Sequence, residues 1–138
     1  MNRSIWIRSI MIGMLFSPVV LAKAEITGTY QCAGESNINN KPFKGTLEIK
    51  AHDKKGLYES QFTYADGSKD VGMLKPSKKE NIFVQYFHSV AAPKASGFTK
   101  FTLKSSQQLV ADFVYISEDT GDIATGSALC TNLKAKKT

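Results

Sequence analysis

The chain has 138 residues, of which 42% are hydrophobic and 22% are charged, a composition that excludes a disordered, collagen-like or coiled-coil protein. The length fits one domain, because domains usually contain ~100–150 residues. The formal net charge of +6 comes from the two ends, where Arg3, Arg8 and Lys23 lie in the first 24 residues and three lysines lie in the last five. The body between them is balanced in charge, which argues against a basic nucleic-acid-binding domain.

The first 24 residues have the pattern of a cleaved export signal. Two arginines precede an apolar stretch at 9–21, and Ala22 and Ala24 are the small residues that a signal peptidase reads, so we predict cleavage after Ala24. A membrane anchor is the alternative, but the apolar run is shorter than the ~20 residues needed to span a bilayer. We expect an exported protein, periplasmic or secreted, with no transmembrane anchor after cleavage.

The remainder of the chain is expected to form strands almost throughout. Segments rich in Val, Ile, Thr, Tyr and Phe recur about every 10–15 residues, separated by turn-forming residues such as Asp66-Gly67. Outside the leader, no stretch of ten or more residues has the apolar spacing of a helix. We predict eight strands, at residues 26–34, 43–52, 57–65, 68–75, 82–90, 97–104, 109–117 and 123–133, followed by a basic tail at 134–138.

Short connections between these strands favour antiparallel neighbours and an up-and-down meander. Eight such strands are expected to close into a barrel, because an open sheet leaves two unpaired edges. The predicted fold class is therefore an all-β, eight-stranded antiparallel up-and-down β-barrel over residues 25–133. A β-sandwich with the same number of strands is the alternative.

Cys32 and Cys130 are the only two cysteines, and they lie near the two ends of the mature chain. Export places them in an oxidising compartment, so we expect a disulfide. In a closed meander the first and last strands pair, which would bring both cysteines together. Two free thiols are the alternative, whereas a zinc site is disfavoured because neither His52 nor His88 lies near a cysteine in sequence.

The later strands do not have the simple alternation of core-facing and solvent-facing residues that the earlier ones show. In the strand at 82–90, the alternation places Val84, Tyr86 and His88 on one face, but Phe83 and Phe87 on the other. Strands that are apolar on both faces are either covered on both or expose a patch that binds something. We therefore expect function in this half of the chain.

The sequence lacks the usual signatures of catalysis. No Gly-x-Ser-x-Gly, Ser-x-x-Lys or His-x-x-x-His pattern is present, and the acidic turn at 117–122 lacks the ligand spacing of a calcium loop. His52 ends a strand at a polar turn, where we expect it to be solvated, and His88 is expected to be a hydrogen-bonded core or rim residue. We expect a monomeric binding protein that is not an enzyme and needs no metal or cofactor.

The opening Gly28-x-Tyr30 resembles the Gly-x-Trp start of lipocalin-like and avidin-like barrels, with Tyr in place of Trp. The resemblance implies that the Tyr30 ring fills the floor of the barrel. Together with Cys32, Asp66-Gly67 and a glycine before Cys130, it resembles small exported bacterial β-barrel proteins, most of them uncharacterised. The first functional hypothesis is a lipocalin-like barrel that holds a small apolar or amphipathic ligand. A barrel filled by its own side chains is the alternative. The candidate ligand contacts are Tyr58, Phe62, Tyr64, Tyr86, His88, Phe113 and Tyr115.

A second hypothesis is an inhibitor or interaction protein that binds a protein partner such as lysozyme. Tyr30-x-Cys32, the late Cys130 and the Ser96-Gly97 pair resemble features of the periplasmic lysozyme inhibitors of bacteria. That resemblance makes Ser96 and Lys100 the contact candidates, in a loop and the strand after it. The chain departs from that family at Lys100, where the inhibitors have a Tyr, and it lacks their later Thr-Lys-Gly.

Overall fold

The computed structural model describes residues 25–37, 41–91 and 94–136 and shows a closed barrel of eight antiparallel strands. Each strand pairs with the next along the chain, and β1 also pairs with β8. The predicted fold is confirmed, and every predicted strand ends within two residues of the observed one. The elements are β1 (Gly28–Ser36), β2 (Pro42–Ala51), β3 (Tyr58–Tyr64), β4 (Lys69–Pro76), β5 (Ile82–Ser89), β6 (Ala95–Ser105), β7 (Gln108–Ser117), β8 (Ile123–Asn132) and the 3-10 helix η1 (Leu133–Lys136).

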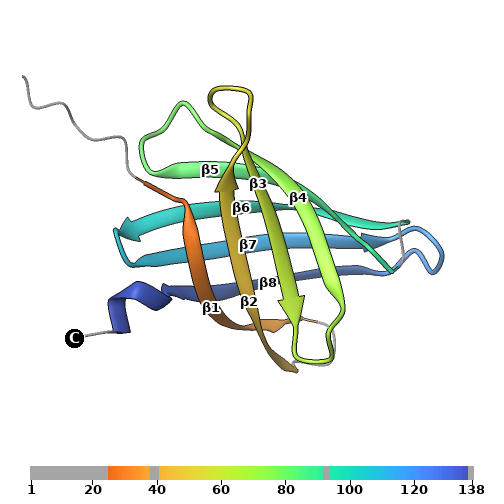
Figure 1. Ribbon diagram of the computed structural model, residues 1–138. Coiled ribbons are helices and arrows are strands. Elements are labelled where there is room, and N and C mark those ends of the chain that lie inside the picture. The colour runs from red at the N-terminus through yellow and green to blue at the C-terminus, as the bar shows by residue number, and fades with distance from the viewer. Residues whose placement is uncertain (1–24, 38–40, 92–93, 137–138) are drawn as a thin grey trace, which may run out of the picture.

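Strands β1–β4 lie in front of β5–β8 and run across them (Figure 1). Because every connection joins neighbouring antiparallel strands, successive connections alternate between the two ends of the barrel. The β1–β2, β3–β4, β5–β6 and β7–β8 connections lie at one end, which we call the mouth. The other end, which we call the floor, holds the remaining connections and η1.

The seam between β1 and β8 is closed covalently. Cys32 lies directly opposite Cys130 in the strand register, their Cα atoms are 4.0 Å apart, and the two sulfurs form a disulfide. The predicted bridge is confirmed, and the described residues include no free cysteine. The bond therefore joins the first and last strands of the meander.

Tyr30 closes the floor. Its side chain is fully buried, its hydroxyl donates to the Ile26 carbonyl oxygen at 2.8 Å, and it also hydrogen-bonds with the Asn132 side chain. Asn132 Oδ1 in turn accepts the Lys134 backbone N–H at 2.9 Å, which caps η1. The last strand therefore stops at Asn132 rather than continuing to Leu133, and the predicted tail begins with a 3-10 turn instead.

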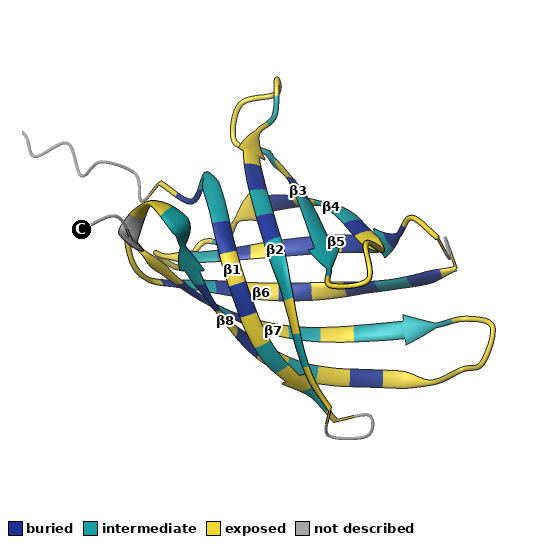
Figure 2. Cartoon of the chain, turned by 60° about the horizontal axis from the view of Figure 1, so that its bottom comes forward, coloured by how far each residue is buried: buried dark blue, intermediate teal, exposed yellow. Residues whose placement is uncertain are grey.

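Inward and outward residues alternate along the strands, as the bands of buried and exposed residues in Figure 2 show. The inward residues of the floor half form one apolar cluster, in which Leu47, Leu74 and Leu109 are almost completely buried. Within the described ranges, no helix is long and apolar enough to cross a membrane. The leader and the cleavage after Ala24 lie outside the described residues and stay predictions.

Candidate functional site

The mouth half of the barrel contains a cavity of about 410 Å³. Small side chains on the inner faces of β7 and β8, Ala111, Ala124 and Ala128, line this space, whereas leucines fill the equivalent interior near the floor. The volume lies within the ~300–1,000 Å³ of typical small-molecule sites. The described side chains therefore do not fill the barrel, and the cavity is the candidate functional site.

Seven aromatic residues line the cavity. Phe43 makes edge-to-face contacts with Phe62 and Phe113, at centroid distances of 6.3 and 5.6 Å. Phe87 and Tyr115 stack at 5.9 Å. The rings come from β2, β3, β5, β6 and β7, so closure of the barrel is what brings them together. The aromatic residues that line the cavity are Phe43, Phe62, Tyr64, Phe87, Phe101, Phe113 and Tyr115.

Four of the seven predicted contacts, Phe62, Tyr64, Phe113 and Tyr115, line the cavity. Tyr58 points into the barrel but lies toward the floor, where its ring packs on Phe83 at 5.9 Å. It belongs to the core rather than to the site.

The predictions for Tyr86 and His88 as cavity residues are wrong. Both lie on the outer face of β5, and Tyr86 is 48% exposed. The interior face of this strand consists instead of Phe83, Gln85 and Phe87. A buried glutamine, Gln85, occupies the middle of the inner face, so alternation alone makes the opposite face the more apolar one.

Asp70 is the acidic group of the cavity and was not among the predicted site residues. It is only 8% exposed, and its Oδ2 accepts a 2.6 Å hydrogen bond from the Tyr64 hydroxyl. Burial raises the pKa of Asp70, while the Tyr64 hydrogen bond and the nearby charge of His88 act to lower it. Alternation with the inward Gly72 and Leu74 on β4 is the sequence signal that could have located it.

The two tyrosines beside Asp70 are also affected by burial. Burial raises the pKa of Tyr64 far above its ordinary range, and the hydrogen bond to Asp70 raises it further. The pKa of Tyr115 is raised first by burial and then by the Asp70 charge, and its hydroxyl hydrogen-bonds with Ser89. Both phenols therefore remain neutral hydrogen-bonding groups at physiological pH.

A second polar spot lies deeper in the cavity. Gln85 and Thr99 face each other across β5 and β6, and both are buried. Gln85 Nε2 donates to the Ser60 hydroxyl at 2.5 Å. Thr99 is 6% exposed, and its side chain forms no hydrogen bond with any residue that the structure describes. This hydroxyl can therefore bond to a polar atom inside the cavity.

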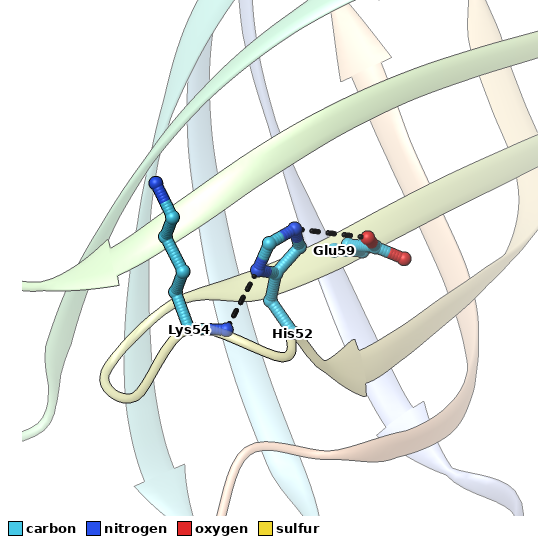
Figure 3. Close-up of polar contacts among 3 residues, drawn as sticks. All are labelled: His52, Lys54 and Glu59. Atoms are coloured by element: carbon cyan, nitrogen blue, oxygen red, sulfur yellow. Dashed lines mark hydrogen bonds and ion pairs between the residues drawn. The ribbon is translucent and has the colours of Figure 1, made fainter.

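His52 lies outside the cavity at the β2–β3 turn and, contrary to expectation, is only partly solvated (Figure 3). Its Nδ1 accepts the Lys54 backbone N–H at 3.0 Å, and its Nε2 lies 3.4 Å from a Glu59 carboxylate oxygen. Since Nδ1 is an acceptor, the proton of the neutral ring lies on Nε2, toward Glu59. The histidine thus stabilises a turn at the floor end.

The outer face of the barrel has an exposed apolar row. Met73, Tyr86, Phe98 and Val114 are successive cross-strand neighbours on β4, β5, β6 and β7, and the Tyr86 and Phe98 rings are 5.5 Å apart. All four are exposed, Phe98 at 55%. Of the two alternatives for strands that are apolar on both faces, the structure thus shows the exposed patch.

Ser96 and Lys100 lie on either side of Phe98 along the outer face of β6. Ser96 was predicted in a loop, but β6 begins at Ala95, because Ala95 and Ser96 pair with Ser117 and Ile116 of β7. Lys100 is exposed. Both candidate partner contacts thus adjoin the apolar row.

Over the described ranges, no three His, Cys, Asp or Glu side chains group closely enough to hold a metal ion. In the acidic turn, Asp119 forms an exposed ion pair with Lys94 at 3.6 Å.

Comparisons with known proteins identify the fold but no family. No protein-family model matches the sequence, and no curated protein matches it significantly. The solved structures that it resembles include designed β-barrels. The barrel mFAP2b bound to DFHBI has a TM-score of 0.62 and 14% identity, covering 77% of this chain and 92% of its own. For the redesigned barrel mFAP1 bound to DFHBI, the TM-score is 0.59 at 16% identity, and the match covers 77% of this chain and 96% of that one. For a de novo designed fluorescence-activating barrel, the TM-score is 0.57 at 17% identity, and the match covers 80% of this chain and 96% of that one. At these identities the likeness concerns the fold alone.

Proposed function

We propose that this protein is an exported, non-enzymatic binding protein that holds a small amphipathic ligand in the barrel cavity. The single observation behind the proposal is the cavity of about 410 Å³ with an aromatic wall and only a few polar groups. Small-molecule sites usually combine a mainly apolar lining with a few placed polar groups that fix the orientation of the ligand. The resemblance to designed barrels with a bound small molecule is consistent with this use of the fold.

Export is supported by the predicted leader and by the disulfide, since disulfides form and persist in oxidising compartments. Native mass spectrometry of the protein purified from its own compartment without denaturation is the first test. A retained small molecule that dissociates on unfolding would support the proposal and give the ligand's mass.

Cavity-filling variants provide a second, independent test. Ala111 lines the cavity, so Ala111→Trp should weaken binding of the neutral apolar probe N-phenyl-1-naphthylamine at least ~10-fold by occupying its space. Ala33, exposed on β1, provides the matched control Ala33→Trp, which should bind like the wild type. The milder Ala111→Leu should have an intermediate effect if the tryptophan variant does not fold. Equal binding by all variants, or none by the wild type, would overturn the proposal.

A second candidate function, binding of a protein partner such as lysozyme, is favoured by the exposed apolar row. Lys75 and Lys100 lie beside the row, each opposite Val84 in the strand register. A partner that fits this face would present an apolar ridge bordered by acidic side chains.

Inhibition of a c-type lysozyme tests this candidate. Phe98→Asp should abolish inhibition, because it places a charge in the middle of the row. Leu129→Asp, at a similarly exposed apolar site on β8 outside the row, should inhibit like the wild type. Absence of inhibition by the wild type would refute the candidate. If sedimentation velocity shows a wild-type dimer that Phe98→Asp disrupts, the row is the dimer interface. That result would refute both this candidate and the predicted monomer.

A further inference from the structure

We infer that the cavity selects a ligand with an apolar body and a protonated amine, and that Asp70 receives the amine near the mouth. This inference rests on the proposed function and specifies its ligand class. The observation that leads to it is a buried carboxylate, with no described lysine within ion-pair distance, in a cavity lined largely by apolar and aromatic side chains.

Asp70 lines the cavity, and no lysine among the described residues lies within ion-pair distance of it. The hydrogen bond from Tyr64 is the one side-chain hydrogen bond that its carboxylate accepts from those residues. A buried charge is costly unless it is paired, and one neutral donor compensates only part of that cost. A cationic group from a ligand would supply the missing partner.

The groups that surround Asp70 are suited to a cation. Tyr64 on β3 and Tyr115 on β7 contribute neutral hydroxyls, and Ser89 lies opposite Asp70 on β5. His88, whose charge acts on Asp70, lies on the outer face of β5 and leaves the cavity side free. The nearest part of the lining therefore contains no fixed positive charge.

Aromatic rings strengthen this preference. The faces of Tyr and Phe rings attract ammonium groups, more strongly when the contact is shielded from water. The rings of Phe62 and Tyr64 lie 4.8 Å apart, and Phe87 stacks on Tyr115, so aromatic groups from two sides of the cavity adjoin the Asp70 region. An amine placed there would contact a carboxylate and ring edges or faces together.

The depth of the cavity sets the orientation of the ligand. Asp70 and Tyr64 lie on either side of the β3–β4 turn, at the mouth, whereas Leu47, Phe101 and the disulfide line the deeper part. An amphipathic amine would therefore insert its apolar body toward the floor and leave its head at the mouth. Lys41 is the lysine that lines the cavity and is exposed, and it would favour the opposite ligand charge.

Three probes with the same chain separate these possibilities. Decylamine, decanol and decanoate are titrated into the mature protein at pH 7 by calorimetry. We expect decylamine to bind about 10- to 100-fold more tightly than decanol, as a charge-assisted hydrogen bond to a buried group implies. Asp70→Asn should remove that advantage and change decanol binding less than about 3-fold.

Asp112→Asn is the matched control, because Asp112 is exposed on the outer face of β7 and its replacement removes the same charge. It should preserve the preference for decylamine. Should Asp70→Asn not fold, the wild type provides a second readout, in which decylamine affinity rises with pH through the titration of Asp70 while decanol affinity stays constant.

The outcomes distinguish this inference from the proposed function. Equal binding of decylamine and decanol, or tighter binding of decanoate, would overturn the amine inference and leave the ligand-binding barrel intact. A wild-type protein that binds none of the three probes, nor the neutral naphthylamine, would overturn both. Retention of the decylamine preference in Asp70→Asn would also refute the role of Asp70.

Discussion

Removal of the disulfide should destabilise the barrel more than the loss of any single hydrogen bond or core contact. Cys32 and Cys130 are separated by 98 positions, so the bond closes a loop that spans most of the folded domain. In the chain-entropy description, a cross-link of this length lowers the entropy of the unfolded state by the equivalent of about 4.7 kcal/mol at 25 °C. Typical domains are stable by only ~5–15 kcal/mol, so the bond accounts for a large share of the total.

Urea unfolding of the oxidised and reduced wild-type protein measures this contribution directly. With a urea dependence of roughly 1–3 kcal/mol per M, reduction should lower the midpoint by about 2–5 M, or leave the protein unfolded in buffer. The double variant Cys32→Ala/Cys130→Ala should lose at least as much stability, because both sulfurs are buried and their packing is lost as well.

Reduction isolates the cross-link, since it leaves both sulfur atoms in the barrel. A loss of less than about 1 kcal/mol on reduction would refute the reasoning. It would mean that the unfolded chain already holds its ends together, or that strain in the native state offsets the entropic gain.

Three further changes test the core and the cavity. Burial holds the pKa of Asp70 above its usual value, so the folded state binds this proton more tightly than the unfolded chain, and the resulting contribution to stability is lost as pH rises through the raised pKa. In urea unfolding, the free energy of unfolding of Asp70→Asn should therefore increase relative to that of the wild type between pH 4 and pH 7. A difference that stays constant with pH would contradict this. Tyr30→Phe leaves the buried Ile26 carbonyl without its donor and should lower the free energy of unfolding by about 1–3 kcal/mol. Tyr58→Phe should change it by no more than about 0.5 kcal/mol, because the Tyr58 hydroxyl has no hydrogen bond to the described residues. Equal losses in the two variants would argue against a stabilising role of the Tyr30 hydroxyl at the floor. Gly97→Ala should lower the free energy of unfolding by about 1–3 kcal/mol in thermal or urea unfolding, because the new Cβ would lie 2.1 Å from a β7 carbonyl oxygen. A variant as stable as the wild type would show that β6 and β7 can move apart at this position.

Much of this fold could be predicted from local sequence. Each strand is a short β-prone run bounded by turn residues, and Asp66-Gly67 forms a turn in which Gly67 has a φ of +90° and Asp66 accepts the Ser68 N–H. The disulfide followed from topology, because a closed meander must pair its first and last strands. These features depend on local conformational preference and chain order, both of which can be read from the sequence.

The cavity depends on contacts between distant residues. Phe62 and Tyr64 were predicted from the regular alternation of their strand, and Phe113 and Tyr115 from the apolar side chains on both faces of theirs. On β5 the prediction of the inner face failed, because Gln85 is buried where it can donate to Ser60, a partner on another strand. The hydrogen bond offsets the cost of burying an amide, and no pattern within a single strand encodes it.

By itself, then, the sequence determined the number of strands, their antiparallel order and the pairing of the cysteines. The tertiary structure decided which face of β5 is internal, where small side chains leave a cavity, and which groups meet in it. Asp70 lies close to Tyr64 along the chain and opposite Ser89 on the neighbouring strand, but its position beside Tyr115 on β7 requires the barrel to close. Closure sets these neighbours because it fixes the distances between strands that are remote in sequence.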